Sequence, residues 1–161
     1  NRVIAFDLRG QGLSGKSAQG HSIAGNADDL AFALQALSIE RALLLGVAYG
    51  GMVALTYLQR HGPTRLRALC LSEMTARLTN DEGWDHPTFG DFPAEAGAGF
   101  AAGVRADRNA ALGGFLLGCF AHTPDEATLA EMTAQTWLTP TDTVATLIED
   151  MVAQDYRAML P

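Results

Sequence analysis

A short turn between an apolar run and a helical pattern has the spacing that most clearly suggests chemistry. Three leucines at 43–45 lead into Gly46-Val47-Ala48-Tyr49-Gly50, which we call the 46–50 turn. The residues after it repeat with the period of one helix face, so the pattern predicts a strand, a sharp turn and a helix. Glycines at both ends remove side chains where the helix folds back on the strand, and the centre of such a turn is strained. A serine there would be presented as a nucleophile, but the residue is Ala48, which has no nucleophilic atom.

A second motif, near the start of the chain, would do different chemistry. Gly10 and Gly15-Lys16-Ser17 have the spacing of a phosphate-binding P-loop and follow an apolar run. A P-loop also requires a helix that begins at its Lys-Ser pair, so that the helix N-terminus faces the phosphates. Gly20 lies in what would be the first turn of that helix, which argues against one. Nucleotide binding at this loop stays as an alternative hypothesis.

The composition is that of an ordinary globular protein. Of the 161 residues, 48% are hydrophobic and 18% are charged, and the net charge is −7. This charge argues against nucleic acid or an anionic membrane as a partner, and the apolar runs are too short to span a bilayer. The two cysteines, Cys70 and Cys119, are too few for a disulfide framework. We expect both to be small core residues in the reducing cytoplasm.

The order of the elements predicts an α/β fold. Two helical patterns alternate with apolar runs, and Ser22 can cap the first helix while Gly62 ends the second. Strands and helices in this rhythm form a parallel sheet with right-handed crossovers. The runs that we expect to be buried strands are residues 2–6, 43–46 and 67–72.

The carboxyl ends of such strands are where a parallel sheet places its active site. Three segments should therefore surround one crevice: Asp7–Gly12, Gly46–Gly50 and Ser72–Thr75. Glu73 is a carboxylate at the third strand end, and we interpret it as making loop contacts, with a catalytic acid as the alternative. Asp28 and Asp29 are interpreted as a solvated first helical turn rather than a catalytic acid pair.

The second half of the chain has helical patterns and no further strand patterns. Thr123 followed by Pro-Asp-Glu predicts a helix start, and Thr141 or Thr143 starts another. We therefore divide the chain into a core unit at residues 1–74 and a helical unit at 75–161. Because the chain opens within a strand pattern and closes on a lead-in to a further element, we interpret it as an internal piece of a longer protein.

The 46–50 turn and its flanks resemble the nucleophile elbow of the α/β-hydrolase superfamily. Residues 22–67 are similar to the elbow region of carboxylesterases, cofactor-free haloperoxidases and enol-lactonases. Residues 75–84 and 155–161 are similar to the entry to and exit from the helical cap of the 3-oxoadipate enol-lactonases. The resemblance implies an α/β-hydrolase fold, with a mostly parallel sheet, flanking helices and an inserted helical cap. It also makes the loop after residue 7 a tight surface loop beside the active site.

The resemblance implies a serine hydrolase that cleaves an ester or lactone through an acyl-enzyme, with no metal and no cofactor. Ala48 stands at the nucleophile position, and the backbone N–H of Tyr49 matches an oxyanion donor. The triad acid and histidine are expected beyond residue 161, and the first oxyanion donor before residue 1. None of the four histidines matches the general base: His21, His61, His86 and His122.

The implied partner is a small-molecule ester or lactone, with no nucleic acid and no membrane, while homo-oligomerisation stays open. Two explanations of Ala48 also stay open. A Ser-to-Ala substitution that inactivates the enzyme is favoured because the rest of the elbow is intact. The other is a natural, non-catalytic relative that binds a small ligand. The residues that we expect to bind the substrate are Val47, Met74, Trp84, Phe115 and Trp137.

Overall fold

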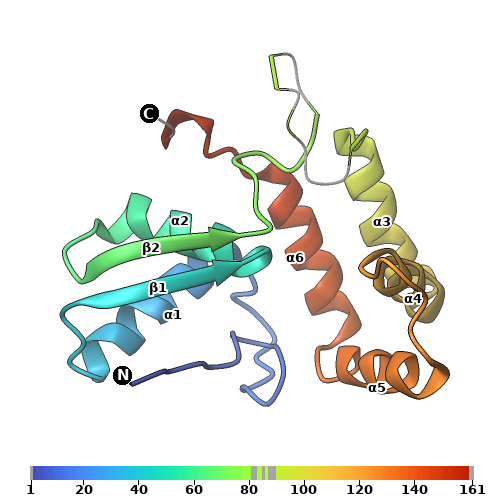
Figure 1. The fold of residues 1–161 in the computed structure, drawn as a ribbon, viewed down its shortest axis with the longest axis horizontal. Helices are drawn as coiled ribbons and strands as arrows, with labels where there is room; N and C mark the ends of the chain where they lie inside the picture. Colours follow the sequence, from blue (N-terminus) through green and yellow to red (C-terminus); the bar gives the residue numbers. More distant parts are fainter. Residues whose placement is uncertain (1, 81–82, 85, 87–89, 160–161) are drawn as a thin grey trace.

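Two parallel strands, β1 (Ala42–Val47) and β2 (Leu66–Ser72), form a sheet at the centre of the first half of the chain (Figure 1). This computed structural model describes residues 2–80, 83–84, 86 and 90–159. Asn1, residues 81–82 of the segment likened to a cap entry, and residues 160–161 of the segment likened to a cap exit lie outside that description. In the register of the pair, Leu43 lies opposite Ala68 and Val47 opposite Ser72. Both strands therefore end at the same edge of the sheet, as predicted from the alternation of apolar runs and helical patterns in the sequence.

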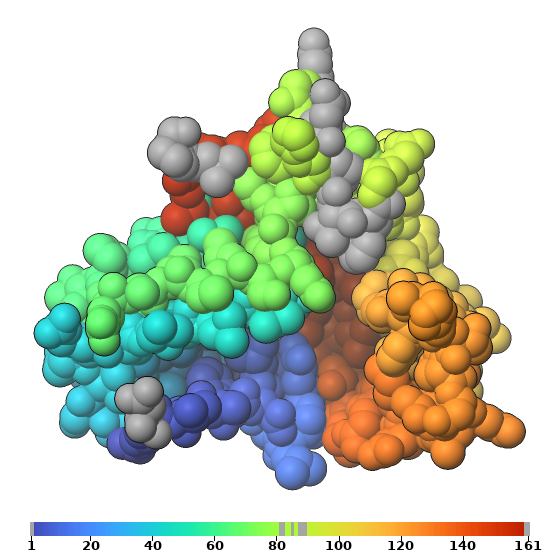
Figure 2. Space-filling model, in the orientation of Figure 1, coloured from blue at the N-terminus to red at the C-terminus, as the bar shows by residue number. Residues whose placement is uncertain are grey.

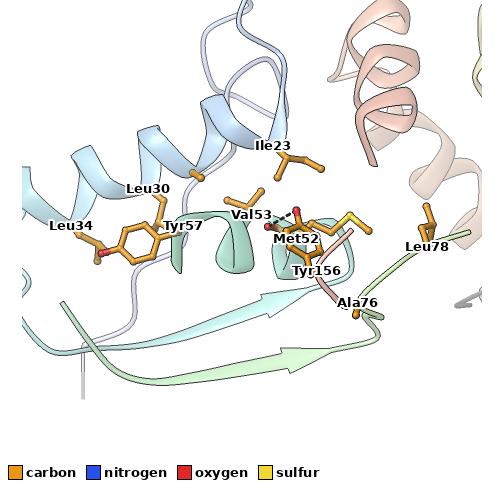
Figure 3. Close-up of a cluster of buried hydrophobic side chains, with 10 residues drawn as sticks. Ile23, Leu30, Leu34, Met52, Val53, Tyr57, Ala76, Leu78 and Tyr156 are labelled. Atoms are coloured by element: carbon orange, nitrogen blue, oxygen red, sulfur yellow. Dashed lines mark hydrogen bonds between the residues drawn. The ribbon is translucent and has the colours of Figure 1, made fainter. Parts of the chain in front are cut away.

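The helices α1 (Ile23–Ala36) and α2 (Tyr49–His61) cover one face of this sheet (Figure 1). Ser22 caps α1 as predicted, with its Oγ accepting a hydrogen bond of 3.0 Å from the N–H of Gly25. The apolar face of α1 packs against α2, and the sheet lies beneath them (Figure 3). The core side chains of these two helices are Ile23, Ala27, Leu30, Leu34, Met52, Val53 and Tyr57.

The other face of the sheet is open, which differs from the prediction of fully buried strands. Leu43 and Leu45 are 67% and 58% exposed, whereas Leu44 between them packs against the core. Figure 2 shows both strands uncovered on the visible face of the molecule. The prediction that both cysteines lie in the core is also wrong, because Cys70, on β2, and Cys119, in the second half of the chain, are both exposed.

The predicted strand at residues 2–6 is not formed in the described structure. The segment is extended and runs beside β1 (Figure 1), but no backbone hydrogen bond joins it to a described residue. A groove of about 290 Å³, lined by Ile4 and Phe6 on one side and Leu43 on the other, separates it from β1. A β-strand requires hydrogen bonds to a neighbouring strand, and this extended segment forms none with the described residues. The apolar run was therefore not sufficient to predict a strand.

The second half of the described chain holds four helices and a short 3₁₀ turn. They are α3 (Ala94–Ala106), α4 (Arg108–Gly118), α5 (Glu126–Thr136), α6 (Thr141–Ala153) and η1 (Arg157–Met159). The start of α6 at Thr141 confirms that prediction. The cap of α5 is Asp125 rather than Thr123, because the Asp125 carboxylate accepts from the N–H of Thr128 at 2.7 Å.

A separate small core joins α3 to α6. Ala101 and Val104 of α3 and Ala145 of α6 are fully buried against one another. The two helices approach so closely that a Cβ built on Gly97 would lie 2.3 Å from a methyl carbon of Val152. Small residues at this crossing are what permit the approach.

Polar contacts fasten α6 and the segment after it to α1 and α2. The Asp150 carboxylate accepts from the backbone N–H of Ile23 at 2.6 Å. Tyr156 is 1% exposed, its hydroxyl lies 2.7 Å from the Thr56 hydroxyl, and it donates to the Met52 carbonyl at 3.2 Å (Figure 3). The helical half is thus held against the core of the first half by hydrogen bonds that are buried at Tyr156 and part-buried at Asp150. No helix in the described part of the chain is long and apolar enough to cross a membrane.

Candidate active site

The 46–50 turn joins the end of β1 to the start of α2, as predicted, and Ala48 is its centre. Ala48 has φ +46° and ψ −117°, a conformation that side-chain-bearing residues rarely adopt and that costs about 1–3 kcal/mol. Two hydrogen bonds hold it: its N–H donates to the carbonyl of Ser72 at 3.0 Å, and its carbonyl accepts from the N–H of Gly51 at 2.8 Å. The Ala48 side chain is exposed at the tip of the turn.

Neighbouring atoms lie so close to Gly46 and Gly51 that a side chain at either position would collide with them. A Cβ on Gly46 would lie 2.6 Å from the carbonyl oxygen of Gly50 and 2.7 Å from Cα of Gly51. A Cβ on Gly51 would lie 2.6 Å from Cγ of Met74, in the segment that follows β2. The expectation of crowding at Gly50 is wrong for the described structure, because no atom lies within 4 Å of a Cβ built there.

Helix α2 begins at Tyr49, and its N-terminal end faces the tip of the 46–50 turn. The first N–H groups of any α-helix lack intrahelical partners and carry partial positive charge. The N–H of Tyr49 forms no hydrogen bond within the described residues. It is therefore free to donate to a negatively charged oxygen held near position 48.

The side chain of Tyr49 points away from this tip, toward the interior, where Asn26 of α1 binds it. The Asn26 amide donates to the Tyr49 hydroxyl at 2.6 Å, and Asn26 is fully buried. Burial raises the pKa of Tyr49 well above its ordinary value, so the hydroxyl is neutral. The sequence analysis missed Asn26. The available signal was a polar residue on the apolar face of α1, one position before Ala27 and three after Ile23.

The segment after β2 lies beside the turn and carries two of the predicted site residues. Met74 packs against Gly51 and the core, and Glu73 precedes it with φ +52°. Glu73 is exposed and forms no hydrogen bond or ion pair with any residue that the structure describes, so the loop contacts expected of it are not made.

The loop after residue 7 lacks the architecture of a P-loop. Its carbonyl groups turn inward onto the Lys16 ammonium, which donates to Gln11 at 3.0 Å, to Ser14 at 2.9 Å and to Gly12. The Asp7 carboxylate closes the loop by accepting from the N–H of Leu13 at 2.7 Å. The next helix along the chain begins at Ile23 rather than at Lys16, so the helix that a P-loop requires directly after its Lys-Ser pair is not formed.

The five residues expected to bind substrate lie in different surroundings. Val47 is half exposed beside Ala48, and Trp84 packs on the core with its indole N–H donating to the carbonyl of Arg77. Phe115 packs against Phe100 of α3, with ring centroids 5.9 Å apart. Trp137 lines cavities of about 470 and 320 Å³, and neither of these is lined by any of the other four.

The acidic pair and two of the histidines form structural contacts. Asp28 accepts hydrogen bonds from Arg60 and from His61 at the C-terminus of α2, and Asp29 pairs with Arg9. His21 contacts the carbonyl of Ser17. Within the described residues no group of three or more His, Cys, Asp or Glu side chains is arranged to hold a metal ion.

Comparisons with known proteins agree with this geometry. A family model described as the alpha/beta hydrolase fold matches residues 1–161. The chain is 37% identical over 123 residues to a pimeloyl-[acyl-carrier protein] methyl ester esterase of Neisseria meningitidis, a match that covers 76% of this chain and 44% of that protein. It is 29% identical over 84 residues to 3-oxoadipate enol-lactonase 1 of Acinetobacter baylyi, covering 52% of this chain and 31% of that protein.

A solved structure extends the fold comparison. An esterase from Exiguobacterium antarcticum superposes with a TM-score of 0.85 at 24% identity, over 94% of this chain and 56% of the esterase. The chain thus spans about half, or less, of the length of the proteins it matches. The match to the family model covers the whole sequence, including β1, the 46–50 turn and α2. The chain belongs to the α/β-hydrolase fold family.

Proposed function

We propose that the protein containing this chain is a hydrolase of carboxylic esters or lactones, and that Ala48 stands where its nucleophilic serine would be. The observation that carries the proposal is the backbone of Ala48. A positive φ between a strand end and a helix start is costly, and it serves to lift one side chain out of the turn toward a reactant. Gly46 supports the same interpretation because it permits the helix to fold back on the strand.

The chemistry would proceed as acyl transfer. With serine at position 48, its hydroxyl oxygen would attack the carbonyl carbon of the ester or lactone, and a general base outside this chain would take the hydroxyl proton. The negative charge that develops on the carbonyl oxygen would accept a hydrogen bond from the Tyr49 N–H. The tetrahedral intermediate would then break its bond to the leaving oxygen, which would take the proton back from the general base and become a free alcohol from an ester or a hydroxyl on the acyl chain from a lactone. Water, activated by the same base, would hydrolyse the acyl-enzyme and restore the serine. With alanine, the first step has no nucleophile, so this form is inactive.

The helical half would act as a cap over the site, with small-molecule substrates entering between it and the 46–50 turn. Support comes from the anchoring of α6 to the N-terminus of α1 through Asp150, which holds the helical half beside the core. Val47 and Met74 are the best supported of the proposed substrate contacts. Val47 precedes Ala48 and is half exposed, and Met74 packs against Gly51.

The test is turnover by the full-length protein with Ala48 and with Ala48→Ser, measured on a panel of p-nitrophenyl esters and of γ- and δ-lactones. We expect turnover only with serine. A matched control is Ala36→Ser, which adds a hydroxyl at an exposed position at the end of α1. Turnover by neither protein, with both folded, would refute the hydrolase proposal for these substrates and would favour the alternative of a non-catalytic ligand-binding relative.

A further inference from the structure

Tyr49 links the candidate site to the buried interior of the protein. Its backbone N–H is at the tip of the 46–50 turn, and its hydroxyl accepts a 2.6 Å hydrogen bond from the Asn26 amide of α1. Asp28 binds the opposite end of α2 through Arg60 and His61. Helix α2 is therefore fastened to α1 at both ends. The far attachment is solvent-exposed, while the one behind the turn joins the fully buried Asn26 to the partly buried Tyr49.

The Asn26 side-chain amide differs from most buried amides because only one of its two polar atoms has a hydrogen-bond partner. Asn26 is fully buried, and its Oδ1 has no hydrogen-bond partner in the described structure. Leaving a buried polar atom unpaired costs about 1–3 kcal/mol, and an apolar side chain of the same shape would avoid that cost. Stability alone therefore does not explain an asparagine at this position.

The turn that Asn26 supports needs external restraint. Ala48 is held in a strained conformation, which persists only when its surroundings fix it. The Ser72 carbonyl restrains the strand side of the turn through the Ala48 N–H. On the helix side, the carbonyl of the peptide that contains the Tyr49 N–H accepts from the Gly51 N–H, and the Tyr49 side chain adds an anchor on a second helix, α1.

We infer that Asn26 is a positioning residue, which acts through the Tyr49 hydroxyl to fix the direction of the Tyr49 N–H. The inference rests on the proposed function, in which that N–H donates to the oxyanion. Deleting an oxyanion donor typically lowers kcat on the order of a hundredfold or more. Misaligning the donor without deleting it should cost less, about tenfold in kcat. KM should change little, because the hydrogen bond strengthens only as charge develops in the transition state.

The test uses the full-length protein with Ala48→Ser as the active parent. Two further substitutions break the same hydrogen bond from opposite ends: Asn26→Leu, which is apolar and similar in shape, and Tyr49→Phe, which removes only the hydroxyl. We expect each to lower kcat about tenfold with KM within twofold, and the double variant to lose no more than either single variant.

A control separates positioning from stability. Tyr156→Phe removes another buried tyrosine hydroxyl, one that bonds Thr56 and the Met52 carbonyl on the same helix and not Asn26. It should lower the melting temperature and leave kcat unchanged. If Asn26→Leu and Tyr49→Phe also lower only the melting temperature, or if their effects on kcat multiply in the double variant, the inference is wrong. Absence of turnover in the Ala48→Ser parent would instead overturn the proposed function and this inference with it.

Discussion

The crowding at Gly46 gives a prediction that tests the turn without any assumption about chemistry. A methyl group on Gly46 would lie 2.6 and 2.7 Å from backbone atoms of Gly50 and Gly51, and backbone cannot rotate away as a side chain can. Overpacking of this kind costs about 1–3 kcal/mol. A methyl group on Gly50 meets nothing within 4 Å, and alanine gains up to about 1 kcal/mol over glycine inside a helix. The effects of these two substitutions, four residues apart, should therefore differ by about 1–4 kcal/mol in the free energy of unfolding.

The assay is denaturant unfolding of the full-length protein carrying Gly46→Ala or Gly50→Ala. We expect Gly46→Ala to lower the midpoint concentration at an unchanged slope, and Gly50→Ala to leave it unchanged or raise it. An equal effect of the two substitutions, in either direction, would refute the close approach of α2 to the end of β1. It would also remove the argument that Gly46 is needed for the turn.

Three further predictions concern strain, charge and packing. Replacing Ala48 by glycine should stabilise the protein by roughly 1 kcal/mol, since the relief of backbone strain exceeds the entropy cost of glycine, and thermal unfolding would measure it. Hydrogen bonds from Arg60 hold the pKa of Asp28 below its usual range. The folded value lies below the unfolded value of about 3.9, so this contribution is complete above roughly pH 4 and is lost as the pH falls through the folded pKa. Because both side chains are 46% exposed, Asp28→Asn should cost no more than about 1 kcal/mol at pH 7 and less in high salt, as measured by denaturant unfolding. Gly97→Ala should lower the melting temperature by crowding Val152, and Val152→Ala in the same chain should restore part of the loss.

The 46–50 turn could be predicted from the sequence because each of its local rules agrees with the others. An apolar run, a glycine at the point of closest approach and a helical period all specify the same strand, turn and helix. Ser22 as a helix cap was predicted for the same reason, since capping acts over a few residues. Thr141 was one of two predicted starts of α6, and the helix begins there after Pro140 without a side-chain cap. The crowding that makes Gly46 necessary and Gly50 dispensable depends on atomic distances that the spacing does not contain.

Features that depend on distant partners could not be predicted. An apolar run such as residues 2–6 indicates that the segment favours burial, but it does not determine which strand would pair with the segment. The Asn26 hydrogen bond joins residues 23 positions apart, and only the packing of α1 on α2 brings them together. In the same way, the exposure of Cys70 follows from an open sheet face and not from the apolar residues around it in the sequence.

The central claim, that position 48 is a nucleophile position, is tested most directly by covalent labelling. The full-length protein with Ala48→Ser would be treated with a fluorophosphonate, which reacts with activated serines whatever their substrate, and digested for peptide mass analysis. The account predicts one added phosphonyl group on the peptide that contains position 48. It predicts no label in the protein with Ala48 or in the Ala36→Ser control. Labelling that is absent in the folded Ala48→Ser protein, or that falls equally on other serines, would contradict the claim.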